Sequence, residues 1–130
     1  MEILRLAQQS NFKSVTIPLP SSKSESNRVL VIDALTKGEN RIANLAEARD
    51  TQTMISLLKK NPPVYDVLDA GTTMRFLTAF TAITQQNKVM TGTPRTCQRP
   101  IGSLVDALRE IGAEIHYLNL DWLLYPSDAA

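Results

Sequence analysis

Positively charged and hydroxyl-bearing side chains cluster between a proline-containing turn and an apolar run. Lys23, Ser24 and Arg28 lie in the segment SKSESNR, which directly precedes VLVIDAL. A helix beginning near Ser24 would direct its unpaired N–H groups, and the positive end of its dipole, toward the preceding loop. Arg28 follows Ser24 by four residues and shares its helix face. The segment therefore predicts a carboxylate or phosphate site, although a helix cap flanked by two solvated cations explains it equally well.

A second motif, DAGTTMRF, lies where a predicted strand ends and a helix begins. Asp69 follows the strand, Gly71 lets the backbone approach a ligand closely, and Thr72 offers a hydroxyl and an N–H group. Arg75, one turn into the helix, fits equally well as a structural residue bonded to nearby carbonyls. The motif predicts a second anion contact.

A third motif, TGTPRTCQRPIG, places Arg95 and Arg99 four residues apart ahead of a helix that starts near Pro100. Arginine grips carboxylate or phosphate through two parallel hydrogen bonds, so it suits a further anion contact. The alternative is that the two arginines tie a loop down. Cys97 is a weak candidate nucleophile, since His116, the one histidine, is expected to pack in a strand and not to act as its base.

Three helix starts that carry hydrogen-bond donors or cations indicate an anion site more strongly than any one of them does. In a layered α/β sheet such loops collect along one edge, and five cations facing one cleft would require a strongly anionic ligand. These cations are Lys23, Arg28, Arg75, Arg95 and Arg99. Neither G-x-x-x-x-G-K-[ST] nor G-x-G-x-x-G occurs, so no motif supports a nucleotide site. Metal-ligand spacing of His, Cys and carboxylates is also absent from the sequence, and no metal is expected.

The elements that would position these residues alternate along the chain, which predicts an α/β or α+β layered fold. Helices are predicted at 24–36, 50–60, 71–84 and 101–112, with Asp50 as the cap of the second. In the third, the spacing puts Met74, Leu77, Phe80 and Thr81 on one side. Strands are predicted at 14–18, 40–45, 64–68, 88–92 and 113–118.

Composition excludes several classes of protein. The 130 residues are 43% hydrophobic and carry a net charge of +1, so there is no broad positive field to attract nucleic acid or a membrane surface. One cysteine forms no internal disulfide, and no segment reaches the ~20 apolar residues that cross a bilayer. The beginning of the chain does not have the pattern of a signal peptide. A cytoplasmic protein is the simplest expectation.

Three segments together resemble the N-terminal portion of the 3-phosphoshikimate 1-carboxyvinyltransferase family, also called enolpyruvylshikimate-phosphate synthases. They are LPSSKSESNR, DAGTTMRFLTAF and TGTPRTCQRPIGSLVDALREIGAEI, in the family's order and covering most of 14–117. The resemblance implies transfer of the enolpyruvyl group of phosphoenolpyruvate to the 5-hydroxyl of shikimate 3-phosphate, with release of phosphate. It places the reaction in chorismate and aromatic amino acid biosynthesis and implies no cofactor.

The same resemblance assigns roles to the residues of the three motifs. It implies that Ser24 and Arg28 hold shikimate 3-phosphate and that Lys23, the catalytic residue, lies between the two substrates and contacts both. The remaining residues would hold phosphoenolpyruvate or line its site: Asp69, Gly71, Thr72 and Arg99, with Arg95 in support.

The resemblance also predicts an architecture of βαβαββ units, of which this chain would supply roughly two. Residues 1–20 would be a strand segment that packs with another domain, 21–118 a partial N-terminal domain, and 119–130 a divergent tail. The family is about three times longer, so we expect a fragment that is inactive alone, because its acid and base carboxylates lie in the second domain. An unpaired strand edge, or Trp122 and its neighbours, would favour self-association.

Two alternatives remain open at this stage. UDP-N-acetylglucosamine enolpyruvyl transferases share the fold and reaction type, but their lysine-asparagine pair and loop cysteine do not match Lys23 followed by serine, or the position of Cys97. A non-enzymatic module that binds RNA termini could share the βαβαββ unit. The aromatic content of 5% and the near-neutral charge argue against a nucleic-acid surface.

Overall fold

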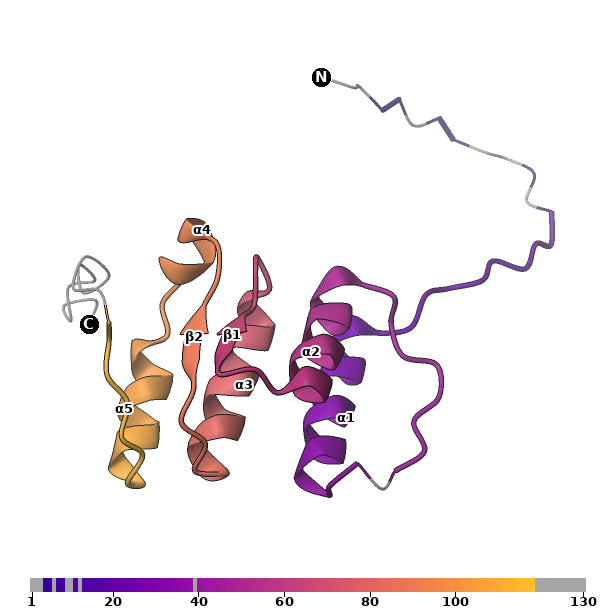
Figure 1. The fold of residues 1–130 in the computed structure, drawn as a ribbon. Coiled ribbons are helices and arrows are strands. Elements are labelled where there is room, and N and C mark those ends of the chain that lie inside the picture. The colour runs from indigo at the N-terminus through magenta and orange to yellow at the C-terminus, as the bar shows by residue number, and fades with distance from the viewer. Residues whose placement is uncertain (1–3, 6, 9–10, 12, 39, 119–130) are drawn as a thin grey trace.

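The computed structural model describes residues 4–5, 7–8, 11, 13–38 and 40–118. Helices and strands alternate in the middle of this part of the chain, residues 49–97, which agrees with the predicted α/β class. The elements are α1 (Lys23–Leu35), α2 (Arg49–Lys60), β1 (Val64–Asp66), α3 (Gly71–Ile83), β2 (Val89–Thr91), α4 (Pro94–Cys97) and α5 (Gly102–Glu110). Figure 1 shows α1 and α2 side by side on one flank of the two strands and α5 on the other.

The two strands pair in parallel, with Tyr65 opposite Met90. Parallel neighbours need a crossover connection, and α3 supplies it. The strands therefore run toward the same end of the molecule, and α3 begins at that end (Figure 1). Beyond the strands, the Thr93 N–H donates to the Leu68 carbonyl at 2.8 Å and holds the two following loops together.

The core lies between β1, α2 and α3. Tyr65 and Val67 are 1% and 0% exposed, and they pack against one face of α3. Met74, Leu77 and Phe80 form that face because residues three apart lie on the same side of a helix, as the sequence pattern predicts. The same cluster contains Leu57 of α2 and Cys97 of α4.

The helix boundaries correct two details of the sequence analysis. The N-cap of α1 is Ser22, whose Oγ accepts from the Glu25 N–H at 3.3 Å, so Ser24 is free of that role. Asp50 is not the cap of α2, which begins at Arg49 and whose cap position, Ala48, makes no side-chain bond. The carboxylate of Asp50 bonds Lys23 instead. The short helix α4 was not predicted, although proline at its start follows the capping Thr93.

The strand predictions at 14–18, 40–45 and 113–118 are wrong, because these residues form no strand in the structure. An extended segment becomes a strand only when a neighbour takes its N–H and C=O groups. Asn44 has a left-handed backbone (φ 58°), which interrupts an extended run, and the Ile115 carbonyl accepts from the Arg109 side chain instead of from a strand. The predicted tail, 119–130, lies outside the described residues.

The N-terminal part differs from the packed centre. Val15, Ile17 and Leu19 alternate along the chain as a strand would, yet their side chains are 74%, 68% and 84% exposed. The alternating pattern alone therefore did not predict the structure of this segment correctly. Within the described ranges, every helix is too short or too polar to cross a membrane.

Candidate functional site

The starts of α1, α2 and α3 meet at the end of the molecule toward which both strands point (Figure 1). The Lys23 ammonium lies 3.0 Å from an Asp50 carboxylate oxygen, which joins α1 to α2. The Thr73 hydroxyl donates to the Asp50 carbonyl at 3.2 Å, which joins α3 to α2. Three positive helix ends are thereby held together. Those of α1 and α3 belong to the predicted motifs, whereas the start of α2 was not predicted to join them.

Arg28 is oriented by contacts within α1 and with α3. Its guanidinium donates to the Ser24 carbonyl at 2.8 Å and to the Ser24 hydroxyl. The same guanidinium lies over the ring of Phe76, with the carbon at its centre 5.4 Å from the ring centroid. Because an aromatic ring face attracts a cation, this contact fixes Arg28 against the first turns of α3. Ser24 and Arg28 are therefore brought together as predicted.

Gly71 and Arg99 lie in direct contact, although they are far apart in the sequence. A Cβ added to Gly71 would lie 2.6 Å from Nη1 of Arg99 and 3.1 Å from its Cδ. Both approaches are too close for a methyl group, so glycine at this helix start is what allows the guanidinium to lie against the backbone. The second and third sequence motifs therefore meet at one point.

Arg75 has the structural role that was one of its two interpretations from the sequence, the other being a ligand contact. Its guanidinium donates to the Pro100 carbonyl at 2.7 Å and to the Gly71 carbonyl at 3.3 Å. These bonds tie the segment before α5 to the first turn of α3. Arg75 thus supports the backbone around Gly71.

The sequence analysis did not identify Arg49. This residue opens α2, and its Nη2 forms an ion pair with the Asp69 carboxylate on the loop before α3. The prediction that α2 begins at Asp50 left Arg49 in a loop and drew no attention to it. The signal that could have found it is the arginine in EARD, directly before an acidic residue at a helix start.

Thr72 and Arg95 are exposed, and within the described part of the chain neither side chain makes a hydrogen bond that joins it to the other motifs. Thr72 is nevertheless placed by α3, next to Gly71. Arg95 lies in α4, which follows β2 at the same end of the sheet (Figure 1). Gly92 allows this approach of the loops, since a Cβ there would lie 2.6 Å from the Leu68 carbonyl oxygen.

The charges at this end are unequal. We call it the cationic end, because six cations lie on the segments that meet there. The same segments carry five carboxylates: Glu25, Glu47, Asp50, Asp66 and Asp69. Asp50 and Asp69 are paired with Lys23 and Arg49. The cations are Lys23, Arg28, Arg49, Arg75, Arg95 and Arg99. Such an arrangement suits a ligand with several negative charges. No group of three or more His, Cys, Asp or Glu side chains that could hold a metal ion occurs among the described residues.

Neither Cys97 nor His116 belongs to a catalytic pair. Cys97 is 7% exposed and its thiol donates to the Gly92 carbonyl at 3.4 Å. Burial raises the pKa of the thiol, and the charge of Asp66 raises it further, so a reactive thiolate is disfavoured. The prediction that His116 packs in a strand is wrong, because its side chain is 74% exposed and lies 3.1 Å from Glu114.

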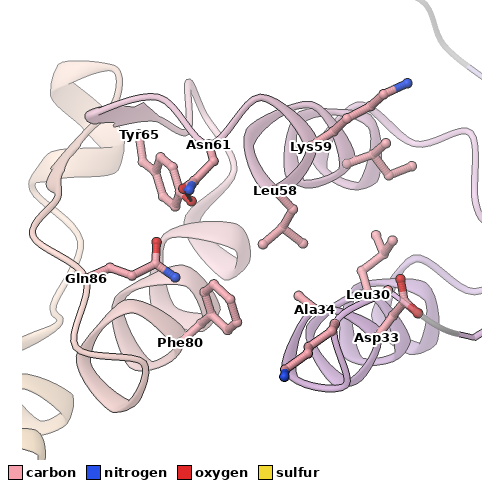
Figure 2. A pocket seen from close by; sticks show the side chains of 12 residues that line it. Leu30, Asp33, Ala34, Leu58, Lys59, Asn61, Tyr65, Phe80 and Gln86 are labelled. Carbon is pink, nitrogen blue, oxygen red and sulfur yellow. Dashed lines mark hydrogen bonds between the residues drawn. The ribbon is translucent and has the colours of Figure 1, made fainter.

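A hollow of about 410 Å³ lies away from the cationic end, among the last turns of α1, α2 and α3. We call it the hollow, and its lining mixes apolar side chains with polar and charged ones such as Asp33, Lys37 and Lys59. Figure 2 shows Leu58, Leu30 and Phe80 pointing toward its centre and Gln86 at its margin. None of the residues predicted to bind an anion lines it.

Comparison with known proteins identifies relatives of one kind. The family model for EPSP synthase (3-phosphoshikimate 1-carboxyvinyltransferase) matches residues 8–62 and 60–124. A 3-phosphoshikimate 1-carboxyvinyltransferase of Bacteroides fragilis (strain YCH46) is 51% identical over 113 residues, which is 87% of this chain and 27% of that protein. The protein of the same name from Sulfurovum sp. (strain NBC37-1) is 41% identical over 128 residues, covering 78% of this chain and 30% of the relative. No solved structure gives a significant match.

Proposed function

This chain belongs to the EPSP synthase family, and we propose on that basis that its cationic end binds shikimate 3-phosphate and phosphoenolpyruvate. The proposed reaction transfers the enolpyruvyl group of phosphoenolpyruvate to the 5-hydroxyl of shikimate 3-phosphate and releases phosphate. Both substrates are multiply charged anions. They match an end of the molecule where cations outnumber carboxylates.

The observation that carries the proposal is the contact between Gly71 and Arg99 beside the joined starts of α1 and α2. We propose that Gly71, Thr72 and Arg99 bind phosphoenolpyruvate. Thr72 would supply a backbone N–H group at the start of α3, and Gly71 leaves the space in which the Arg99 guanidinium lies. An arginine that lies against a glycine backbone can bind a phosphate or a carboxylate through two parallel hydrogen bonds.

We assign the α1 residues to the other substrate. Ser24 and Arg28 hold the shikimate ring with its carboxylate, and the contact of Arg28 with Phe76 keeps the guanidinium in place before the ligand arrives. Lys23 lies between the two substrates, held there by Asp50. Asp69 and Arg95 line the phosphoenolpyruvate region.

These positions suit the chemistry of the reaction. The 5-hydroxyl oxygen adds to the enol carbon of phosphoenolpyruvate as the hydroxyl loses its proton and the methylene carbon gains one. Loss of phosphate from the resulting tetrahedral species, together with a proton from the methyl group, restores the double bond. That species is crowded and negatively charged. Cations fixed by the fold, such as Lys23 and Arg99, stabilise it without reorganising during the reaction.

The chain spans about 27% of the length of the Bacteroides fragilis relatives it matches. The proposal for these 130 residues is therefore one of substrate binding, and the complete reaction is proposed for the whole protein. We also propose, from the family, that the described elements belong to two βαβαββ units.

A binding titration tests the proposal. We expect calorimetry of the 130-residue chain to detect shikimate 3-phosphate, and Arg28→Ala to weaken its binding by about tenfold or more, because a charge-assisted contact is lost. Arg41→Ala is the matched control, since Arg41 is an exposed arginine in the connection between α1 and α2. Equal losses in both variants would mean that net charge alone attracts the ligand. No binding by the unmodified chain contradicts the proposal.

A further inference from the structure

The loop between β1 and α3, residues 67–71, has an unusual backbone. Leu68 has a φ of 55°, a left-handed conformation that residues with a side chain rarely adopt. Hydrogen bonds hold it there: the Leu68 N–H donates to the Asp66 carboxylate at 2.9 Å, and the Leu68 carbonyl accepts from Thr93 at 2.8 Å. The Gly71 N–H donates to the Asp69 carbonyl at 3.1 Å. The position of Asp69 therefore affects the Gly71 amide directly.

Arg49 reaches this loop from another element. Its ion pair with the Asp69 carboxylate is the one side-chain hydrogen bond between α2 and residues 67–71 within the described part of the chain. The other bonds of the loop come from its own residues, from β1 and β2, from Thr93, and from Arg75 of α3, which donates to the Gly71 carbonyl. Arg49 thus fixes the loop relative to α2, and Asp50 next to it fixes α2 relative to Lys23.

We propose that Arg49 is a positioning residue, which acts through Asp69 and its bond to the Gly71 N–H to hold the start of α3 where the Thr72 N–H can meet an anion. This inference rests on the proposed function, because the anion is phosphoenolpyruvate in that proposal. Arg49 links two parts of the cationic end: the start of α2, where Asp50 holds Lys23 of α1, and the loop before α3. It acts without touching the substrate.

We do not expect this ion pair to contribute much to the free energy of unfolding of the whole chain. The side chains of Arg49 and Asp69 are 71% and 47% exposed, and exposed ion pairs add little to the free energy of unfolding. An orienting contact can still matter, since a loop held in an unfavourable backbone conformation depends on every bond that retains it. The pair therefore acts on local geometry.

Two readouts on the 130-residue chain test the inference. The first is amide hydrogen exchange of Gly71 and Thr93 without ligand, by NMR, because these N–H groups make the bonds that hold the loop. The second is the dissociation constant of phosphoenolpyruvate in the presence of shikimate 3-phosphate. The variants are Arg49→Gln, which removes the charge, and Arg49→Lys, which keeps it. Arg41→Gln is the control with the same change in net charge.

We expect Arg49→Gln to speed exchange of both amides and to weaken phosphoenolpyruvate binding, each by about three- to tenfold, with Arg49→Lys between it and the unmodified chain. Arg41→Gln should change neither. Unaltered exchange in Arg49→Gln would overturn the inference. If binding were nevertheless weaker, Arg49 would be identified as a direct ligand. If the unmodified chain does not bind phosphoenolpyruvate, the proposed function fails, and the exchange data still decide whether Arg49 holds the loop.

Discussion

The cationic end and the hollow are built from opposite ends of the same three helices. The starts of α1, α2 and α3 carry Lys23, Arg49 and Gly71, and they are joined by ion pairs and by the bond of Thr73 to the Asp50 carbonyl. Their last turns surround the hollow of about 410 Å³, which is lined by Leu30, Leu58 and Phe80 together with polar and charged side chains. One set of helices therefore presents two environments with different chemistry.

The difference shows that the size of a hollow and its fitness for a ligand are separate properties. Helix starts offer unpaired N–H groups and favour negative charge, whereas helix ends offer carbonyls and do not. The hollow lies at the helix ends, so an anionic substrate gains nothing there from the backbone. For the proposed anion site, helix direction is therefore a better guide than the volume of a hollow.

The largest effect is expected at the hollow. Phe80 is 6% exposed and belongs to the core cluster, so Phe80→Ala should lower the free energy of unfolding by about 3–5 kcal/mol. Urea unfolding followed by circular dichroism measures this change. Ile83→Ala, at a position that is 52% exposed on the same helix, should lower it by about 1 kcal/mol or less. Similar losses in both variants would show that α3 is not packed as described.

A smaller effect of a different kind is expected at the cationic end. Gly71→Ala places a methyl group 2.6 Å from the Arg99 guanidinium, which must move away. We expect phosphoenolpyruvate to bind at least about tenfold more weakly, a change of about 1.4 kcal/mol. Stability should change by about 1 kcal/mol or less, because alanine is the better helix former.

A matched control for Gly71→Ala is Gly102→Ala, since Gly102 also lies at a helix start and a Cβ there meets no atom within 4 Å. Calorimetric titration with phosphoenolpyruvate, in the presence of shikimate 3-phosphate, compares the two variants. If Gly102→Ala weakens binding as much as Gly71→Ala, the contact with Arg99 is not the reason.

The two regions were not equally predictable from the sequence. Lys23, Ser24, Arg28 and Gly71 could be identified because helix starts have local signals, namely capping residues, glycine and clustered cations. The core face of α3 was equally clear from its period. These are features that a few neighbouring residues determine.

Arg49 and the three wrong strands required information that is not local. The partner of Arg49 is Asp69, twenty residues away, so no spacing within α2 reveals it. A strand depends on a neighbour that takes its hydrogen bonds, and segment 14–18 has alternating side chains without such a neighbour in the described part of the chain. The hollow likewise results from the packing of three helices and has no sequence signature.

The smallest expected effect is a pH dependence of the free energy of unfolding, which comes from a residue of the hollow and not from the cationic end. Tyr65 lines the hollow, is 1% exposed, and donates from its hydroxyl to the Asn61 side chain at 2.8 Å. Burial raises the pKa of the Tyr65 hydroxyl above its ordinary value of 10.0. The folded protein therefore holds this proton more tightly than the unfolded chain, so the stabilisation is complete below pH 10 and is lost as pH rises through the folded-state pKa.

Tyr65→Phe should lower the free energy of unfolding by about 1 kcal/mol at pH 8, because one hydrogen bond is removed and the Asn61 carbonyl remains partly accessible to water. The difference between the two proteins should shrink from pH 10 to pH 11, since only the unmodified chain loses stability as Tyr65 ionises. Urea unfolding at each pH measures it. A difference that stays constant would show that Tyr65 is not buried as described. Because the hollow is separate from the cationic end, phosphoenolpyruvate binding at pH 8 should be unchanged, and a loss of binding would mean that the two regions are coupled.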